Sequence, residues 1–146
     1  MHAIRTECVI PASAAKVWAV LSDFASYAAW NPLNVSATGE AKVGAKVAMV
    51  FLDLSRPGSG ATIRQTVTLA ACAPERELAW TGSVPLLFSG RHGFLLTQRD
   101  GGTHLVHTES LSGLIPAGWS KARVERDFVP HYEAVNRALA ARVAAL

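Results

Sequence analysis

The sequence predicts an α+β domain spanning residues 1–146, in which a curved antiparallel sheet of about seven strands is covered by one long C-terminal helix. Several segments alternate between apolar and polar side chains, which is the pattern of strands with one buried face. From about residue 120, apolar residues recur every three or four positions, which indicates an amphipathic helix. Because the strand connections are short, no parallel crossover is needed, and only the final helix is long enough to cover the sheet.

The N-terminal part is expected to form a strand followed by two short helices. Residues 2–10 alternate in polarity, and Pro11 ends this strand. Ser13 can cap the first helix by accepting a hydrogen bond from a free backbone N–H. Asp23 can cap the second helix, which ends near Pro32 because proline disfavours a helical conformation in the residue before it.

Six further strands follow, separated by turn signals rich in glycine and proline. Asp100-Gly101-Gly102 is typical of a tight hairpin. The expected strands are residues 33–39, 45–54, 61–72, 76–82, 91–99 and 103–112. Beyond them, Pro130 should kink or restart the long helix by removing a backbone donor.

Composition excludes several classes of protein. Half of the residues are hydrophobic and 17% are charged, which argues against a disordered chain. No apolar run is long enough for a membrane span, and no secretory pattern is present, so a cytoplasmic protein without stable membrane insertion is expected. The net charge of +3 is scattered rather than gathered into a basic stripe, so nucleic-acid binding is not expected.

The hairpin of residues 91–112 carries the most informative cluster. Its turn allows two registers, and in both the same side chains share one face, since strand side chains alternate with a period of two. The apolar members of the set indicate the inner face. The side chains on this face are His92, Phe94, Leu96, Leu105, His107, Glu109 and Leu111.

A buried charge is costly unless it is paired, so a His–Glu pair is expected here. Three interpretations stay open: a satisfied pair that holds the strands together, polar anchors for a ligand, or acid–base catalysis by His107, Glu109 or His92. Two histidines and a carboxylate could also hold zinc. No compact metal motif, nucleotide fingerprint or nucleophile motif accompanies them, so neither a metal nor another cofactor is expected.

Other candidate pocket residues lie on the helices and in two apolar loops. Tyr132 and Asn136 are one helical turn apart, on the face that also carries Phe128. Trp30 ends the second short helix and is either pocket wall or core. The loop of residues 83–90 presents Leu86, Leu87 and Phe88, which suit a pocket lid, a homodimer contact or inward packing. The Leu114–Pro116 loop can close the same mouth.

These residues together resemble the START-like, or SRPBCC, superfamily, and its polyketide cyclase/dehydrase-like bacterial branch most of all. The resemblance extends over the whole chain, and it implies the helix-grip fold, in which the sheet wraps around the C-terminal helix. The segments that carry it are residues 11–23 and 27–32, Gly44, residues 77–80 and 90–94, His107–Leu114 and Tyr132–Leu139.

The resemblance implies a small hydrophobic ligand, either aromatic, lipid-like or polyketide-like, held between sheet and helix. The apolar wall would be formed by Phe94, Leu96, Leu105 and Leu111, and the few polar anchors that such pockets use would be His92, His107 and Glu109. The alternatives are a cyclase or dehydratase acting on a poly-carbonyl substrate, with His107 or Glu109 as base, and a protein-interaction module that uses its apolar loops.

Overall fold

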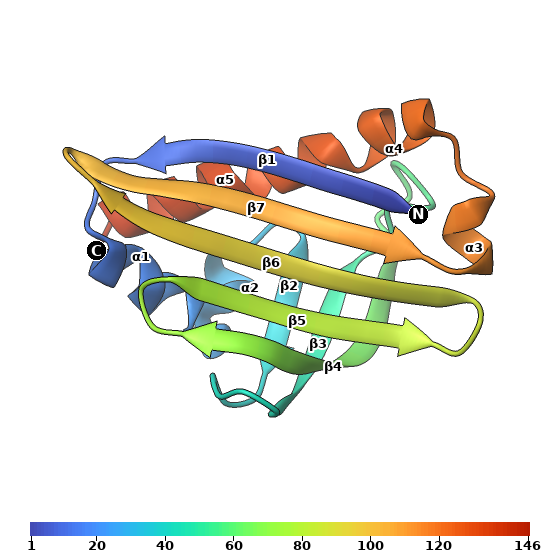
Figure 1. The fold of residues 1–146 in the computed structure, drawn as a ribbon, viewed down its shortest axis with the longest axis horizontal. Coiled ribbons are helices and arrows are strands. Elements are labelled where there is room, and N and C mark those ends of the chain that lie inside the picture. Colours follow the sequence, from blue (N-terminus) through green and yellow to red (C-terminus); the bar gives the residue numbers. More distant parts are fainter.

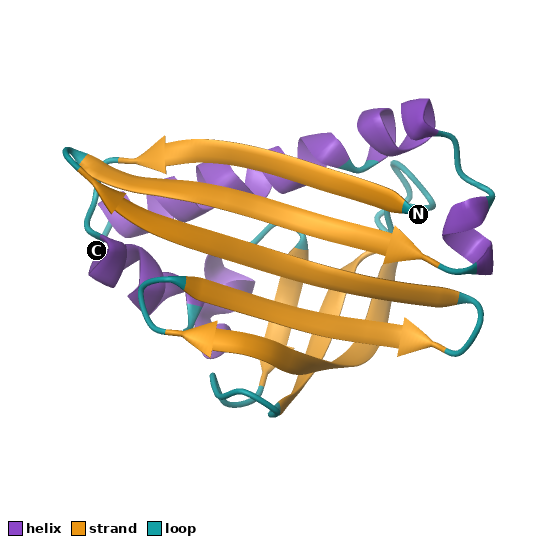
Figure 2. Cartoon of the chain, viewed as in Figure 1, coloured by secondary structure: helices purple, strands orange, loops and turns teal.

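The computed structural model describes all of residues 1–146 and confirms the predicted helix-grip architecture. One antiparallel sheet with the strand order β1-β7-β6-β5-β4-β3-β2 curls around the C-terminal helices, which lie behind it in the view of Figures 1 and 2. The strands are β1 (His2–Ile10), β2 (Asn34–Thr38), β3 (Lys46–Leu52), β4 (Thr62–Ala73), β5 (Glu77–Val84), β6 (Phe88–Arg99) and β7 (Gly102–Ser112).

Short helices follow the first strand, and the long C-terminal helix is divided in two. Ser13 and Ser120 cap their helices by accepting bonds from the N–H groups of Lys16 and Arg123. The long helix breaks at Phe128 and restarts just before Pro130, as expected from the missing donor. The helices are α1 (Ala14–Leu21), the 3₁₀ turn η1 (Phe24–Ser26), α2 (Tyr27–Trp30), α3 (Leu114–Ala117), α4 (Lys121–Asp127) and α5 (Val129–Ala144).

The β6–β7 hairpin adopts the register in which Arg99 pairs with Gly102. His92 therefore lies opposite Glu109, and Phe94 lies opposite His107. Gly101 has a φ of 82°, a left-handed conformation that glycine adopts without steric cost. The hairpin turn thus determines which polar groups meet on the inner face of the sheet.

Two connections differ from the sequence prediction. Strands β5 and β6 continue to a Val84–Phe88 pair, so most of the segment 83–90, expected to be a loop, belongs to the sheet. The remaining turn contains Leu86 at a φ of 66°. The second expected loop contains α3, whose Leu114 N–H donates to the Leu86 carbonyl, so the two apolar connections lie against each other.

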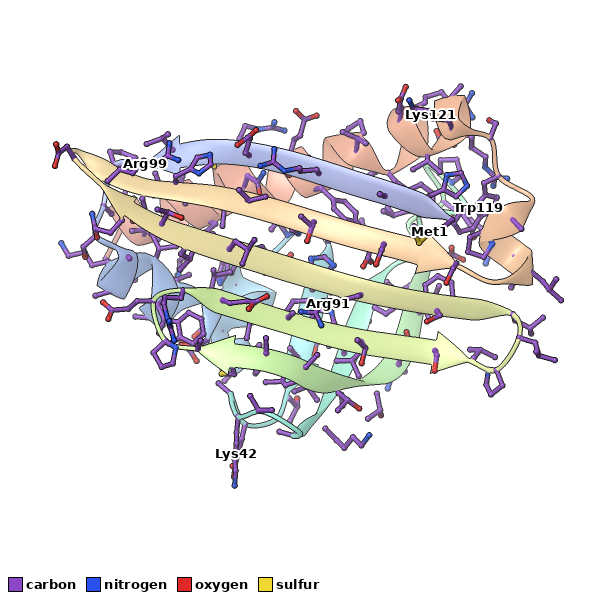
Figure 3. The ribbon with its side chains drawn as sticks, viewed as in Figure 1. Met1, Lys42, Arg91, Arg99, Trp119 and Lys121 are labelled. Carbon is purple, nitrogen blue, oxygen red and sulfur yellow. The ribbon has the colours of Figure 1, made fainter.

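The core fills the groove under the C-terminal half of α5. Leu78, Phe94 and Leu105 of the sheet are fully buried against Leu139 of that helix. The outer face of the sheet is polar and carries the ion pair between Arg91 and Glu77, with Arg91 visible on that face in Figure 3. None of the helices has the length and apolar character that crossing a membrane requires.

Candidate functional site

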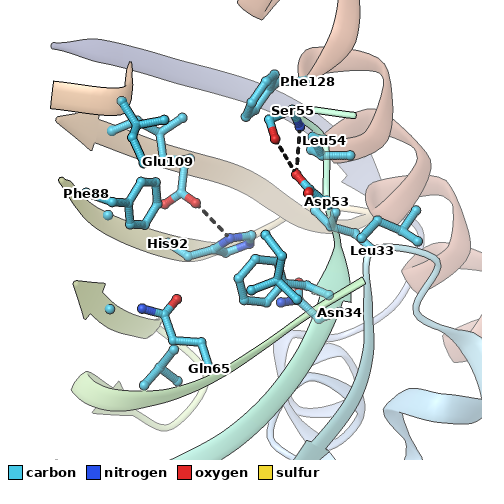
Figure 4. A pocket seen from close by; sticks show the side chains of 18 of the residues that line it. Leu33, Asn34, Asp53, Leu54, Ser55, Gln65, Phe88, His92, Glu109 and Phe128 are labelled. Atoms are coloured by element: carbon cyan, nitrogen blue, oxygen red, sulfur yellow. Dashed lines mark hydrogen bonds and ion pairs between the residues drawn. The ribbon is translucent and has the colours of Figure 1, made fainter. Parts of the chain in front are cut away.

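The groove under the N-terminal half of α5 is not filled and contains a cavity of about 320 Å³. The strands β2 to β7 and the turn of α3 contribute most of its wall, and Phe128 and Tyr132 contribute from the helix side. The lining is mainly apolar, with a few polar groups such as Gln65, part of which Figure 4 shows. Val84 and Ile115 are exposed and also line the cavity, so it reaches the surface beside α3.

A pair of glycines creates much of this space. Gly82 of β5 and Gly90 of β6 are direct cross-strand partners, and both line the cavity. Glycine in a strand interior removes the side chain that would otherwise fill the inner face. A methyl group on Gly82 would lie 2.9 Å from the end of the Gln65 side chain, and one on Gly90 would lie 3.2 Å from the ring tip of Phe88.

The polar wall of the cavity consists of His92, Glu109 and Tyr132. Oε1 of Glu109 lies 3.6 Å from Nδ1 of His92 and accepts a 3.1 Å hydrogen bond from the Tyr132 hydroxyl. The other carboxyl oxygen, Oε2, is buried and has no hydrogen-bond partner. The His92 ring stacks on Trp80 at 4.6 Å and on Tyr132 at 5.4 Å, so its plane is fixed by aromatic contacts on β5 and α5. Figure 4 shows the His92–Glu109 contact across β6 and β7.

Behind this wall, a chain of hydrogen bonds leads through the core to the first strand. Nε2 of His107 lies 2.6 Å from Nε2 of His92, and Nδ1 of His107 lies 2.9 Å from Oδ1 of Asn136. The Asn136 amide donates to the hydroxyl of Thr6, which itself donates to the backbone carbonyl of His107. Polar groups in the middle of an apolar core are therefore satisfied by one another.

Burial determines the protonation state of two groups in this network. Desolvation, helped by the charge of His92, holds the pKa of His107 well below its ordinary value, so this imidazole is neutral at neutral pH. Desolvation and the neighbouring Glu109 hold the pKa of the Tyr132 hydroxyl well above its ordinary value, so it remains a hydrogen-bond donor. The wall therefore combines a carboxyl group, an imidazole and a phenol that keeps its proton.

The structure separates the candidate residues of the sequence into two groups. Six of them line the cavity: Phe88, His92, Glu109, Leu111, Phe128 and Tyr132. The other seven lie outside its lining, mostly because the groove beneath the second half of the helix is filled by core. These are Trp30, which packs on Tyr27, the half-exposed Leu87, and the buried Phe94, Leu96, Leu105, His107 and Asn136.

Several lining residues were not candidates in the sequence. Gln65 occupies an inward position in an otherwise apolar alternating set, which is a signal that could have singled it out. Gly82 and Gly90 are strand glycines, and such residues often mark a close approach or a space. Asn34, Phe51 and the segment 52–55 carry no comparable pattern, because they reach the cavity only through the curl of the sheet.

Solved structures with the same fold share little sequence with this chain. A START superfamily protein from Mycobacterium smegmatis superposes with a TM-score of 0.80 at 16% identity, covering 99% of both chains. The Zhui aromatase/cyclase from Streptomyces sp. R1128 gives 0.74 at 18% identity, covering 98% of this chain and 93% of its own. Ara h 8.0201 gives 0.71 at 15% identity, covering 99% of both. No curated protein sequence matches the chain.

The curled sheet, the enclosed helix and the cavity between them define a protein of the helix-grip class. A family model described as polyketide cyclase/dehydrase and lipid transport matches residues 1–144. The chain therefore belongs to this polyketide cyclase/dehydrase and lipid transport family.

Proposed function

We propose that the protein binds a small hydrophobic molecule in the cavity between the sheet and the N-terminal half of α5. The observation that carries this proposal is the mainly apolar cavity of about 320 Å³ that reaches the surface and has one polar wall. Ligand pockets typically have this character, with apolar lining and a small number of placed polar groups. The paired glycines support it further, because a core designed only for stability would fill that position.

Membership of a family whose description includes lipid transport is consistent with a hydrophobic ligand. The proposal is tested by extracting the purified protein with organic solvent and analysing the extract by mass spectrometry. Thermal unfolding is measured in parallel against a panel of apolar compounds, since a ligand that binds only the folded state raises the unfolding temperature. We expect a bound molecule or a concentration-dependent rise in unfolding temperature. Neither result in a well-folded sample would contradict ligand binding.

A second candidate function is acid–base catalysis on a poly-carbonyl substrate, as in a cyclase or dehydratase. It is favoured by the position of His92 and Glu109 together at the cavity wall, where one could take a proton from a substrate carbon or oxygen and the other could return one. His107 lies behind His92 and would act only through it. The similar fold of an aromatase/cyclase supports the same candidate.

Catalysis is tested on a synthetic poly-β-carbonyl thioester with product analysis by mass spectrometry. We expect His92→Ala and Glu109→Ala to lower the turnover rate by 100-fold or more, the usual contribution of a general acid or base. Unchanged turnover in both variants would assign the reaction to other groups. If the wild-type protein binds a ligand but shows no turnover, the catalytic candidate is wrong and the binding function remains.

A further inference from the structure

We infer that the ligand carries a hydroxyl group that donates a hydrogen bond to Oε2 of Glu109, and that Asn136 is a positioning residue which sets this preference through His107 and His92. The inference rests on the proposed binding function and names the chemical class of the ligand: an apolar alcohol, phenol or enol. It follows from the donor-to-acceptor direction in the series of hydrogen bonds that runs from Thr6 through the core to the cavity wall.

The direction is determined at the end of the hydrogen-bond chain that lies away from the cavity, at Thr6. The hydroxyl of Thr6 has one proton, which it donates to the backbone carbonyl of His107, so it must accept from the amide N–H of Asn136. The Asn136 oxygen therefore faces Nδ1 of His107, at 2.9 Å. Because an amide oxygen has only lone pairs to offer, Nδ1 of His107 carries the proton.

The same direction continues through both imidazoles. His107 is completely buried and neutral, so with Nδ1 protonated its Nε2 has a lone pair. Nε2 of His92 lies 2.6 Å away and must therefore carry a proton and donate it. Nδ1 of His92 is left to face Oε1 of Glu109, at 3.6 Å.

This last contact needs a proton of its own. Without one, the lone pair of the His92 nitrogen would face the lone pairs of the carboxyl oxygen, which is repulsive. The proton is carried either by Nδ1 of His92 or by Oε1 of Glu109. In both states Oε2 of Glu109 has only lone pairs, and the Tyr132 hydroxyl is already engaged with Oε1. Oε2 is thus a buried acceptor for which the protein supplies no donor.

A ligand hydroxyl can supply that donor, whereas a ketone or ether oxygen would bring a second set of lone pairs against Oε2. In the empty protein the atom itself is covered, although Glu109 lines the cavity. The ring tip of Phe88 rests over Gly90, next to the His92–Glu109 pair on the inner face (Figure 4). The inference requires the Phe88 side chain to turn aside so that a ligand hydroxyl reaches Oε2.

Three probes of one shape test the inference: 2-naphthol, 2-methylnaphthalene and 2-acetylnaphthalene, with dissociation constants measured by calorimetry. We expect the wild-type protein to bind 2-naphthol about tenfold more tightly than either other probe. Glu109→Met removes both carboxyl oxygens at a similar side-chain length, so no acceptor remains at the position of Oε2. This variant should lose the preference for naphthol and bind the three probes with similar affinity.

The tautomers of His92 and His107 in the wild-type protein give a second measurement, which needs no ligand. Nitrogen-15 NMR of the wild-type protein should show a proton on Nδ1 of His107 and on Nε2 of His92.

Asn136→Leu tests the role of Asn136. In this variant the proton of His107 should no longer be held on Nδ1, and the naphthol preference should fall to within about twofold, while binding of 2-methylnaphthalene changes little.

The outcomes separate the inference from the proposed function. If all three probes bind the wild-type protein equally, the cavity binds apolar ligands but the hydroxyl preference is wrong. If His107 carries its proton on Nε2 instead, the direction of the chain and the role of Asn136 are wrong. If no probe binds and no other apolar compound stabilises the protein, the proposed function fails together with the inference.

Discussion

Gly82 and Gly90 face each other across β5 and β6 on the inner surface of the sheet, within the lining of the cavity. On one side of this pair, Trp80 and His92 form the next rung and also line the cavity, and the rung beyond them, Leu78 and Phe94, belongs to the buried core. On the other side, Val84 and Phe88 form the last rung before the turn. The glycine pair therefore marks the place where the fold leaves room for a ligand.

Filling the glycine pair should reduce ligand binding without reducing stability. Gly90→Ala places a methyl group against only the ring tip of Phe88, and Gly82→Ala places one against the end of Gln65, both of which can move. Neither glycine has a left-handed backbone, and alanine lowers the entropy of the unfolded chain. We expect unfolding free energies unchanged or higher by up to about 1 kcal/mol, with apolar ligands bound at least tenfold more weakly, as checked by urea unfolding and calorimetry.

The matched control for this prediction is Gly93→Ala, in the same strand but on the opposite face of the sheet. The added methyl group would lie 3.0 Å from the hydroxyl of Thr108, and Gly93 does not line the cavity. This variant should bind ligands as the wild-type protein does. If Gly82→Ala and Gly90→Ala also retain full affinity, the ligand does not occupy the space above the glycine pair.

Stability should fall in mild acid because of His107. Its pKa in the folded protein is held well below the ordinary value of 6.5, chiefly by burial. Below pH 6.5 the unfolded chain therefore takes up a proton that the folded protein does not, which favours unfolding. We expect this residue to contribute a loss of up to about 1.4 kcal/mol per pH unit below that point, and none above about pH 7.5.

The measurement is urea unfolding of the wild-type protein and of His107→Gln between pH 8 and pH 5. The difference in unfolding free energy between the wild-type protein and the variant should become smaller as the pH falls, because the variant lacks the titrating group. Leu69→Ala, at another fully buried position of the sheet, is the control and should lower stability without changing its pH dependence, because neither side chain titrates. A constant difference between wild type and His107→Gln over this range would show that His107 does not resist protonation in the folded state.

Tyr132→Phe should destabilise the protein more than the loss of an ordinary hydroxyl. The Tyr132 hydroxyl donates the hydrogen bond that Oε1 of Glu109 accepts, and Oε2 has no partner, so removing the hydroxyl leaves the carboxyl group unsatisfied at a cost of about 1–3 kcal/mol. Tyr27→Phe is the control, since that buried hydroxyl donates to the neutral carbonyl of Leu21 and should contribute about 0.5–1.5 kcal/mol. Urea unfolding of both variants checks the order, and a smaller effect for Tyr132→Phe would contradict it.

Leu86→Gly should raise stability, because Leu86 has a φ of 66° in the turn between β5 and β6. A side chain is disfavoured in this conformation, and proline followed by glycine is the usual pair at such positions of a type II turn. Leu86 is 85% exposed, so little burial is lost on its removal. We expect a gain of about 0.5–1 kcal/mol in the free energy of unfolding. Leu86→Ala keeps the Cβ atom and should show no such gain, and equal stability of the two variants would show that the turn is not strained.

Most of the fold followed from patterns local in sequence. Alternation located the strands, and the Asp100-Gly101-Gly102 turn allowed two registers, of which the structure adopts the one that places His92 opposite Glu109. The segment 83–90 was predicted as a loop because three large apolar residues interrupt the alternation near Pro85. In the structure, pairing with β5 continues β6 back to Phe88, and this tertiary pairing overrides the local signal.

The extent of the cavity could not be derived from the same patterns. Phe94 and His92 share one face of β6, yet one belongs to the filled core and the other to the cavity wall. The difference depends on their neighbours: Phe94 lies opposite Leu78 in the filled core, whereas the rung next to His92 is the glycine pair, which leaves space. Such contacts join segments far apart in the chain, and periodicity within a strand does not record them.

The central claim is that an apolar ligand lies over the glycine pair with a hydroxyl on Glu109. The most direct test is a crystal structure of the protein with 2-naphthol, together with one of Gly90→Ala grown under the same conditions. We predict the ring above Gly82 and Gly90 with its oxygen about 3 Å from Oε2 of Glu109 in the wild-type crystal, and an empty cavity in the variant. A ring bound outside the cavity, or equally occupied in both crystals, would contradict the claim.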